Sequence, residues 1–353
     1  MKPVRLAVVG VGLIGAKHAA LIHSHAMCEL VGIADHDPAG RAVADRLGVP
    51  FYSTAEELFD REKPQGAILA TPNSHHADAA EQCVKQGLHM LIEKPIAETS
   101  QQAQRIVEAT AKSGLRVLVG HHRRHNPLIR KTRELVQGGT LGSLVGVSVL
   151  WALKKPDAYF EVGWRRERSG GGPLLINLIH ELDCLRFICG EIREVYAQTS
   201  SAVRKFEVED SLSISIRFAN GALGTVMASD ATPAAWSYEA VTGENRSYFH
   251  TGENCYHFLG TQASLAFPRM ELWRYSAKPG QGWQDPMERV RLEVPTADPL
   301  TLQLEHFCRV VRGEEAPVID APDGAASLAV ALAVRESATE QAPRLVSSTT
   351  DVR

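Results

Sequence analysis

The 353-residue sequence lacks several patterns that would assign it to a particular class of protein. No apolar run approaches the roughly 20 residues of a membrane-spanning helix, so we expect no membrane span. The net charge is −3 and the sequence contains no block of basic residues, which argues against nucleic acid or an anionic membrane as a partner. No internal repeat or low-complexity tract is present, so an ordinary globular protein is expected.

The sequence also lacks any C-x-x-C pair. Its six cysteines are scattered, a distribution typical neither of a disulfide framework nor of a zinc site. We therefore expect free thiols, no metal site and a cytoplasmic protein. Lys2 and Arg5 precede an apolar stretch that faintly resembles a signal peptide, but the stretch is too short and continues directly into a glycine-rich motif, so we reject that interpretation.

That glycine-rich motif is the first informative feature that is present. Residues 4–9 form a short, mostly apolar run with β-branched valines, which predicts a buried parallel strand, and three glycines follow at G-x-G-x-x-G spacing. The spacing predicts a dinucleotide cradle, with a tight turn, a close approach to a pyrophosphate and a helix over residues 13–25 whose N-terminus faces the phosphates. The cradle residues are Gly10, Gly12, Leu13, Ile14 and Gly15.

An acidic residue lies where such a cradle needs one. Asp35 ends the next strand-like run, residues 30–34, and comes twenty residues after Gly15. At that distance a carboxylate accepts hydrogen bonds from the adenine ribose hydroxyls, and it repels a 2′-phosphate. We therefore expect NAD as the cofactor in preference to NADP, although His36 and Arg41 lie close by and could serve a phosphate.

The order of strand-like and helix-like segments changes near residue 122. Before it, the βαβ alternation continues, which predicts a doubly wound parallel sheet. After it, alternating strands dominate, among them residues 210–219, which end at the hairpin signal Asn220-Gly221. We expect an α/β protein with a dinucleotide-binding domain over residues 1–122 and a second α/β domain over residues 123–353, built on a large, mostly antiparallel open sheet with helices on one face.

A lysine follows the strand expected at residues 89–92, in the sequence Glu93-Lys94-Pro95. Ligands of such sheets bind outside the carboxyl ends of the strands, so Lys94 is well placed to reach a substrate. Its ammonium can hydrogen-bond the reacting oxygen and stabilise alkoxide character as a hydride leaves. Glu93 would anchor the lysine or contact the nicotinamide ribose, and the bond before Pro95 is a candidate cis peptide.

A histidine on the helix expected at residues 173–189 is the candidate proton acceptor. The unperturbed pKa of histidine lies near neutrality, which suits His180 to general base catalysis. Asn177 and Asp183 lie three residues before and after it and share its helix face. Asn177 would bind a substrate hydroxyl, while Asp183 would orient the imidazole or pair with Arg186.

These motifs together resemble the Gfo/Idh/MocA family of oxidoreductases over nearly the whole chain. The matching segments are residues 10–15, Thr71-Pro72-Asn73 with His76, Glu93-Lys94-Pro95, residues 124–127, the triple glycine 170–172 with His180 and Asp183, and residues 303–307. The resemblance implies a Rossmann domain followed by an α/β domain, NAD or NADP, sugar-like or cyclitol substrates, and homodimers or homotetramers formed through the second sheet.

The resemblance also assigns further residues to the site. Thr71, Pro72, Asn73 and His76 would border the cofactor, Arg124 and Trp164 would contact the substrate, and Arg165 would lie near the cofactor. One departure concerns position 176, where many members carry an aspartate four residues before the histidine. Here the residue is Ile176. An aspartate-assisted proton relay is therefore not expected, which leaves Lys94 and His180 to handle the hydroxyl proton.

Three functions are compatible with these residues. The first is an NAD-dependent dehydrogenase of a secondary alcohol in a sugar, sugar acid or cyclitol. The second is a dehydrogenase of a carboxylated cyclic cis-dihydrodiol, since the basic run from His122 to Arg124 would suit a carboxylated ring. The third is a non-catalytic NAD-sensing protein, an alternative that the missing aspartate favours and that the retention of Lys94 and His180 disfavours.

Overall fold

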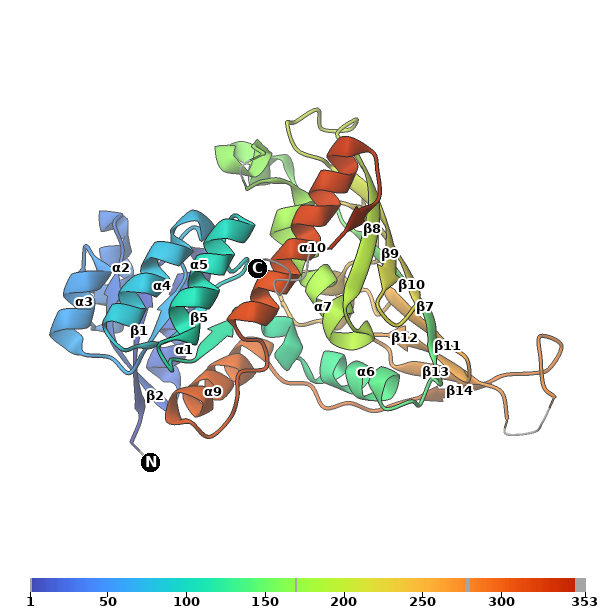
Figure 1. The fold of residues 1–353 in the computed structure, drawn as a ribbon, viewed down its shortest axis with the longest axis horizontal. Helices are drawn as coiled ribbons and strands as arrows, with labels where there is room; N and C mark the ends of the chain where they lie inside the picture. The colour runs from blue at the N-terminus through green and yellow to red at the C-terminus, as the bar shows by residue number, and fades with distance from the viewer. Residues whose placement is uncertain (1, 169, 277–279, 347–353) are drawn as a thin grey trace. The chain divides into compact units, whose positions relative to one another are not determined.

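The computed structural model describes residues 2–168, 170–276 and 280–346, which fold into two compact units. The first unit contains the chain up to His122 together with Leu300–Leu328, and the second contains Arg123–Pro299 and the segment that begins at Ala329 (Figure 1). The division falls after residue 122, and residues 300–328 return to the first unit after the chain has formed most of the second.

The first unit is a six-stranded parallel sheet in the order β3-β2-β1-β4-β5-β6. The strands are β1 (Val4–Val9), β2 (Cys28–Ala34), β3 (Phe51–Tyr52), β4 (Gly66–Leu69), β5 (His89–Ile92) and β6 (Val117–Val119). The strand order reverses between β1 and β4, where doubly wound sheets bind ligands. The prediction of a Rossmann-type sheet is confirmed.

Helices α1 (Leu13–Ser24), α2 (Arg41–Leu47), α3 (Ala55–Glu62), α4 (His76–Lys85) and α5 (Ser100–Ala111) connect these strands. Two of these helices begin differently. Thr99 caps α5, since its side chain accepts from the Gln102 amide. Helix α4 has no side-chain cap, and a 3₁₀ turn at residues 73–75 leads into it.

Helix α9 (Pro299–Arg312) attaches residues 300–328 to the first unit. Phe307 is fully buried, and the Arg312 guanidinium donates to the carbonyls of Lys2 and Met27 at 3.1 and 3.2 Å. After this helix, the Ile319 carbonyl accepts from the amide of Val119 in β6 at 3.0 Å. The segment therefore completes the hydrogen bonding and the core of the first unit.

The second unit is a nine-stranded sheet in the order β14-β13-β12-β11-β7-β10-β9-β8-β15. Its strands are β7 (Leu144–Ala152), β8 (Ile192–Ser200), β9 (Ser211–Phe218), β10 (Leu223–Ser229), β11 (Tyr256–Gly260), β12 (Ala263–Phe267), β13 (Glu271–Arg274), β14 (Glu288–Arg291) and β15 (Arg344–Leu345). Only β7 and β10 pair in parallel, so the expected mostly antiparallel sheet is confirmed. The turn at Asn220-Gly221 joins β9 to β10, as predicted.

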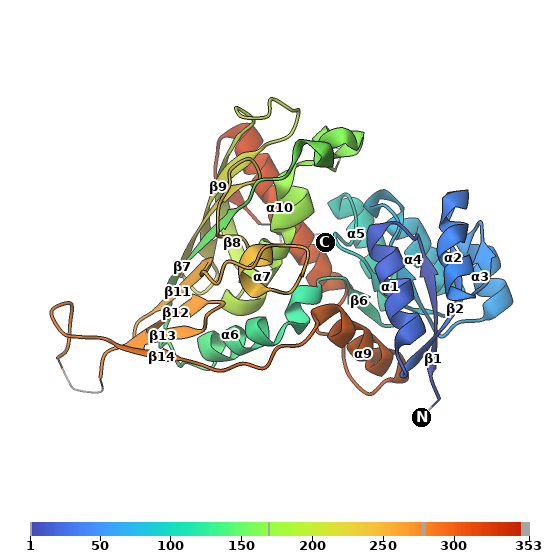
Figure 2. The ribbon, with the colours of Figure 1, turned by 180° about the vertical axis from the view of Figure 1, so that it is seen from behind.

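Helices α6 (Pro127–Gln137), α7 (Ile179–Cys189) and the later part of α10 (Ala321–Glu340) cover one face of this sheet (Figure 2). Strand alternation explains which side chains they cover: in β9, Leu212, Ile214 and Ile216 are buried while the residues between them are not. The short helix α8 (Tyr238–Thr242) also belongs to this unit. Among the described residues, no helix is long and apolar enough to cross a membrane.

Candidate functional site

The glycine motif forms the turn between β1 and α1, and each glycine has a different structural reason. Gly10 has φ +85°, and a Cβ there would lie 2.7 Å from the Thr71 amide nitrogen. A Cβ at Gly15 would lie 1.9 Å from the Gly10 carbonyl oxygen, so only glycine lets α1 approach the turn. At Gly12 no heavy atom lies within 4 Å of the same position, which leaves the open space that a pyrophosphate requires.

Asp35 lies at the end of β2, beside this turn. Its Oδ2 accepts from the Val11 amide at 2.7 Å and its Oδ1 accepts from the Asp37 amide at 2.9 Å. The carboxylate therefore fixes the conformation of the turn. A cavity of about 310 Å³ adjoins it, lined by residues that include Gly10, Asp35, His36, Ser53, Thr71 and Pro72. These residues fit the adenine ribose of a dinucleotide.

The loop after β4 supplies Thr71, Pro72 and Asn73. The Thr71 hydroxyl is buried and has no hydrogen-bond partner among the described residues, so a bound cofactor could supply one. His76 is 1% exposed, and its ring nitrogens lie 2.9 Å from the Thr71 carbonyl and 3.1 Å from the Pro95 carbonyl. Burial lowers the pKa of His76. His76 thus braces two loops against each other, and direct contact with the cofactor stays a prediction.

Glu93 and Lys94 follow β5, and Glu93 is buried. Its carboxylate lies 2.8 Å from His18 Nε2 and accepts from the Lys94 amide at 3.2 Å. Burial alone would raise the pKa of Glu93, but the hydrogen bond and charge of His18 and the charges of Lys94 and His122 lower it. The carboxylate is therefore ionised and holds the turn that carries Lys94. The Lys94–Pro95 bond is cis, as hypothesised.

His18 was missed by the sequence analysis. It lies in the first helix of the cradle, 75 residues before Glu93, and only the fold brings the two side chains together. A histidine in a helix that follows a glycine motif carries no specific sequence signal. Its contact nevertheless links the cofactor-binding helix to the turn that presents Lys94.

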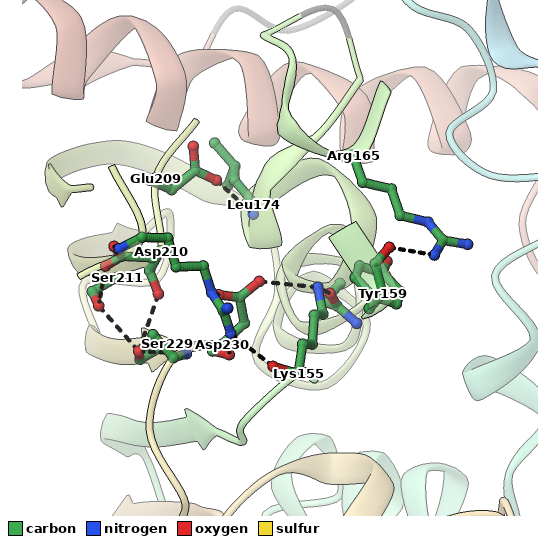
Figure 3. Close-up of polar contacts among 12 residues, drawn as sticks. Lys155, Tyr159, Arg165, Leu174, Glu209, Asp210, Ser211, Ser229 and Asp230 are labelled. Carbon is green, nitrogen blue, oxygen red and sulfur yellow. Dashed lines mark hydrogen bonds and ion pairs between the residues drawn. The ribbon is translucent and has the colours of Figure 1, made fainter. Parts of the chain in front are cut away.

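In the second unit, His180 lies in the first turn of α7, a helix whose residues are all buried. Residues 174–178 form a π-helical turn that leads directly into α7, and Asn177 lies in that turn. Such turns occur frequently at functional sites. The Leu174 amide donates to Glu209 at 2.9 Å, and a Cβ at Gly172 would lie 2.5 Å from the same carboxylate (Figure 3). The glycine-rich stretch therefore permits Glu209 to hold the first turn of this helical segment.

A second residue missed by the sequence analysis is Lys155, which follows the end of β7. It is 7% exposed, and its ammonium donates to Asn177 Oδ1 at 2.8 Å and lies 3.2 Å from the Asp230 carboxylate (Figure 3). Burial lowers the pKa of Lys155, and Asp230 offsets part of this effect. A lysine that lies shortly after a strand and directly before a proline was available as a signal, because Lys94 has a similar setting.

The basic run after β6 has a structural explanation. Arg123 is buried and donates to Glu181 at 2.6 Å and to Glu239 at 2.9 Å, and its guanidinium stacks on Tyr238. Arg124 is also buried and makes a bidentate hydrogen bond to Asp183. These ion pairs engage the guanidiniums of both arginines. Contact between Arg124 and a substrate stays a prediction.

Trp164 and Arg165 lie in a 3₁₀ turn, residues 163–166. Trp164 is 48% exposed, which leaves its ring available to a ligand. Arg165 donates to the Tyr159 carbonyl at 2.7 Å, and its guanidinium lies 4.0 Å from the centre of the Tyr159 ring (Figure 3). The Nε atom of Arg165 is buried without a partner among the described residues. The expected contacts of this pair with cofactor and substrate stay predictions.

Comparison with protein families gives two adjacent matches. Residues 4–121 match the oxidoreductase family with an NAD-binding Rossmann fold, and residues 129–266 match the GFO/IDH/MocA C-terminal domain. The two matches together span most of both units.

Individual relatives are more distant. The chain is 32% identical over 231 residues to inositol 2-dehydrogenase from Rubrobacter xylanophilus, a match that covers 63% of this chain and 64% of the relative. It is 25% identical to D-xylose 1-dehydrogenase (NADP(+)) 2 from Haloferax volcanii, over 94% of this chain and 96% of the relative. The chain spans 54% to 60% of the length of three further relatives that it matches.

Solved structures share the fold. The WlbA dehydrogenase from Bordetella pertussis, solved with NADH and UDP-GlcNAcA, superposes with a TM-score of 0.80 at 23% identity and covers 98% of this chain and 99% of its own. A levoglucosan dehydrogenase solved with NADH and levoglucosan has a TM-score of 0.79 at 21% identity, covering 98% and 99%. At these identities the likeness establishes the fold.

Proposed function

Because the chain belongs to the GFO/IDH/MocA family of NAD-binding oxidoreductases, we propose that it is an NAD-dependent dehydrogenase. Its substrate would be a secondary alcohol of a sugar, sugar acid or cyclitol, or the ketone in the reverse direction. The observation that carries the proposal is the turn after β5, where the buried, ionised Glu93 holds Lys94 at the carboxyl edge of the cofactor-binding sheet. Relatives named as inositol and D-xylose dehydrogenases support this class of substrate.

The proposed chemistry assigns a separate role to the cofactor and to each of three side chains. The bound nicotinamide supplies hydride transfer to or from the carbinol carbon. Lys94 would donate a hydrogen bond to the reacting oxygen and stabilise its negative charge. His180 would take the hydroxyl proton during oxidation and return it during reduction. Asp35 would hold the adenine ribose and disfavour a 2′-phosphate, which gives the preference for NAD over NADP.

We also propose a homodimer or homotetramer formed through the open face of the second sheet. Leu223, Met227 and Leu259 project from this face and are 54%, 49% and 45% exposed. The registers bring Leu223 and Leu259 to opposite sides of Gly146 in β7, which has no side chain to separate them, whereas Met227 lies beyond the polar pair Thr225 and Ser148. Exposed apolar side chains of this kind on an uncovered sheet are typical of a surface that a second subunit covers. Sedimentation of the protein would test the proposal, which predicts no stable monomer at micromolar concentration.

The function is tested by calorimetric titration with NAD and with NADP, followed by an absorbance screen for NADH production. The screen covers D-glucose, D-xylose, D-gluconate, myo-inositol and one carboxylated dihydrodiol. NAD binding with turnover of a sugar or cyclitol supports the proposal, and turnover of the dihydrodiol alone would replace its substrate class. NAD binding without any turnover would favour an NAD sensor instead.

A further inference from the structure

Lys155 permits only one of the two flipped orientations of the Asn177 side-chain amide. Lys155 Nζ lies 2.8 Å from the amide oxygen. An ammonium group donates hydrogen bonds and accepts none, so the amide oxygen must face the lysine and the amide nitrogen must face away from it. The opposite orientation would place an NH₂ group against an ammonium and would lose this hydrogen bond.

The amide nitrogen of Asn177 is therefore a donor with a fixed direction. It donates to no residue in the described parts of the chain, and it does not belong to the buried polar atoms that lack a partner. It is consequently open to solvent. Asn177 lies in a π-helical turn, three residues before His180. Such turns occur frequently at functional sites, and the fixed, solvent-accessible NH₂ group of Asn177 is suited to donate to an acceptor oxygen of a ligand.

Lys155 is itself held from the opposite side. The Asp230 carboxylate lies 3.2 Å from Lys155 Nζ and 3.2 Å from Arg204 Nε. Arg204 also donates to the carbonyls of Lys155 and Asp230, at 2.9 and 2.6 Å. These contacts fix both ends of the lysine, because the backbone is bound by Arg204 and the ammonium by Asp230. Figure 3 shows Lys155 and Asp230 side by side.

We propose that Lys155 is a positioning residue that presents the Asn177 amide nitrogen to the substrate. This inference rests on the proposed function, and it adds a requirement on the substrate. The substrate atom that meets Asn177 must be an acceptor oxygen of a hydroxyl, carbonyl or carboxylate group. Asn177 is then a binding donor and does not substitute for the aspartate that other members carry at the position of Ile176, because a fixed NH₂ group has no lone pair available to take a proton.

Four variants test the proposal. Asn177→Asp keeps the contact with Lys155 and removes the outward donor, and Lys155→Met removes the group that orients the amide. The double variant combines Lys155→Met with Asn177→Asp. Lys154→Met is the matched control, since Lys154 is the exposed neighbour of Lys155. Thermal unfolding of each variant identifies any that fail to fold.

Kinetics are measured with NAD and whichever of D-glucose, D-xylose, D-gluconate and myo-inositol the wild-type protein turns over. We expect Asn177→Asp to raise KM about tenfold with a smaller change in kcat, because one hydrogen bond to the substrate is lost. Lys155→Met should have a similar effect, the double variant should be no worse than Asn177→Asp, and Lys154→Met should match wild type. An unchanged or lower KM in Asn177→Asp, or additive effects in the double variant, would overturn the proposal.

A second measurement does not depend on turnover. In protein labelled with ¹⁵N-asparagine, the side-chain NH₂ signal of Asn177 should be that of a fixed amide, and it should broaden or shift in Lys155→Met but not in Lys154→Met. An Asn177 signal insensitive to Lys155→Met overturns the orienting role. If the wild type turns over none of the four sugars, the proposed function fails, and this signal alone decides whether Lys155 orients Asn177.

Discussion

Each unit contains a buried glutamate that contacts a basic side chain: Glu93 contacts His18 in the first unit, and Glu181 contacts Arg123 in the second. The pKa values of the two glutamates nevertheless move in opposite directions. Three cationic groups act on Glu93, namely His18, Lys94 and His122, and its pKa is lowered. Glu181 is the more deeply buried, and Arg123, the cation that pairs with it, is shared with Glu239. Burial therefore raises the pKa of Glu181 to about 7. Burial acts on both carboxylates in the same sense, and the charges beside each of them decide the direction in which its pKa moves.

The largest expected effect is on catalytic turnover, when Lys94, the lysine next to Glu93, is replaced. Lys94→Ala should lower kcat by about 10²–10³-fold, because a donor to the developing alkoxide is lost. NAD affinity should change little, since the cradle is untouched. Steady-state kinetics and calorimetry measure both quantities, and Lys85→Ala, at an exposed lysine of α4, is the control. Full turnover in Lys94→Ala would show that this lysine is not catalytic.

The second prediction concerns the stability that the charged glutamate provides. Glu93→Gln should lower the free energy of unfolding at pH 7 by about 2 kcal/mol, because a neutral amide replaces the buried carboxylate that contacts His18. The pKa of Glu93 is depressed in the folded state, so its contribution is present above about pH 4.5 and is lost as pH falls below that value. The deficit of Glu93→Gln in thermal unfolding should therefore shrink in acid, and a deficit independent of pH would contradict the assignment.

A third carboxylate, Asp35, is held by backbone amides instead of side-chain cations. Asp35→Ser should reduce the preference for NAD over NADP about tenfold, because the charge that repels a 2′-phosphate is removed. Parallel titrations with the two cofactors measure the ratio. His36→Ser, at the exposed neighbour, is the control, and discrimination that stays at the wild-type value in Asp35→Ser would reject this role.

The smallest expected effect is in the second unit. The pKa of Glu181 is raised in the folded state, so folding favours its protonated form and stability falls as pH rises from about 4.5 to about 7. Glu181→Gln removes this dependence. The melting temperature of the variant relative to wild type should therefore increase by a few degrees across that window, the opposite trend from Glu93→Gln. Parallel slopes for the two variants would refute the comparison between the glutamates.

The sequence was sufficient to predict the parts of the fold and of the candidate site that depend on neighbouring residues. The cradle, the two-sheet α/β architecture and the cis bond at Pro95 all follow from short motifs in which the residues that interact are close in the chain. The Glu-Lys-Pro turn is recognisable for the same reason, because Glu93 and Lys94 are adjacent.

Interactions between distant segments could not be predicted in this way. His18 and Glu93 are 75 residues apart, and Lys155 and Asp230 lie on different strand ends of the second sheet. Arg123 and Arg124 give a second example: the sequence shows a basic run, and only the fold shows that each of them has a buried carboxylate partner. Local composition reports which charges are present, and only the tertiary structure determines which of them neutralise one another.

The return of residues 300–328 to the first unit has a consequence for the order of folding during synthesis. When residue 122 leaves the ribosome, β6 still lacks the Ile319 carbonyl, and the surface that will receive Phe307 is uncovered. About 180 further residues must be made before α9 arrives, which at 5–20 residues per second takes roughly 10–40 s. Nearly all of the second unit emerges during this interval. During this interval the nascent cofactor-binding unit exposes the apolar surface that Phe307 later covers. A chaperone would have a hydrophobic surface to bind at this stage.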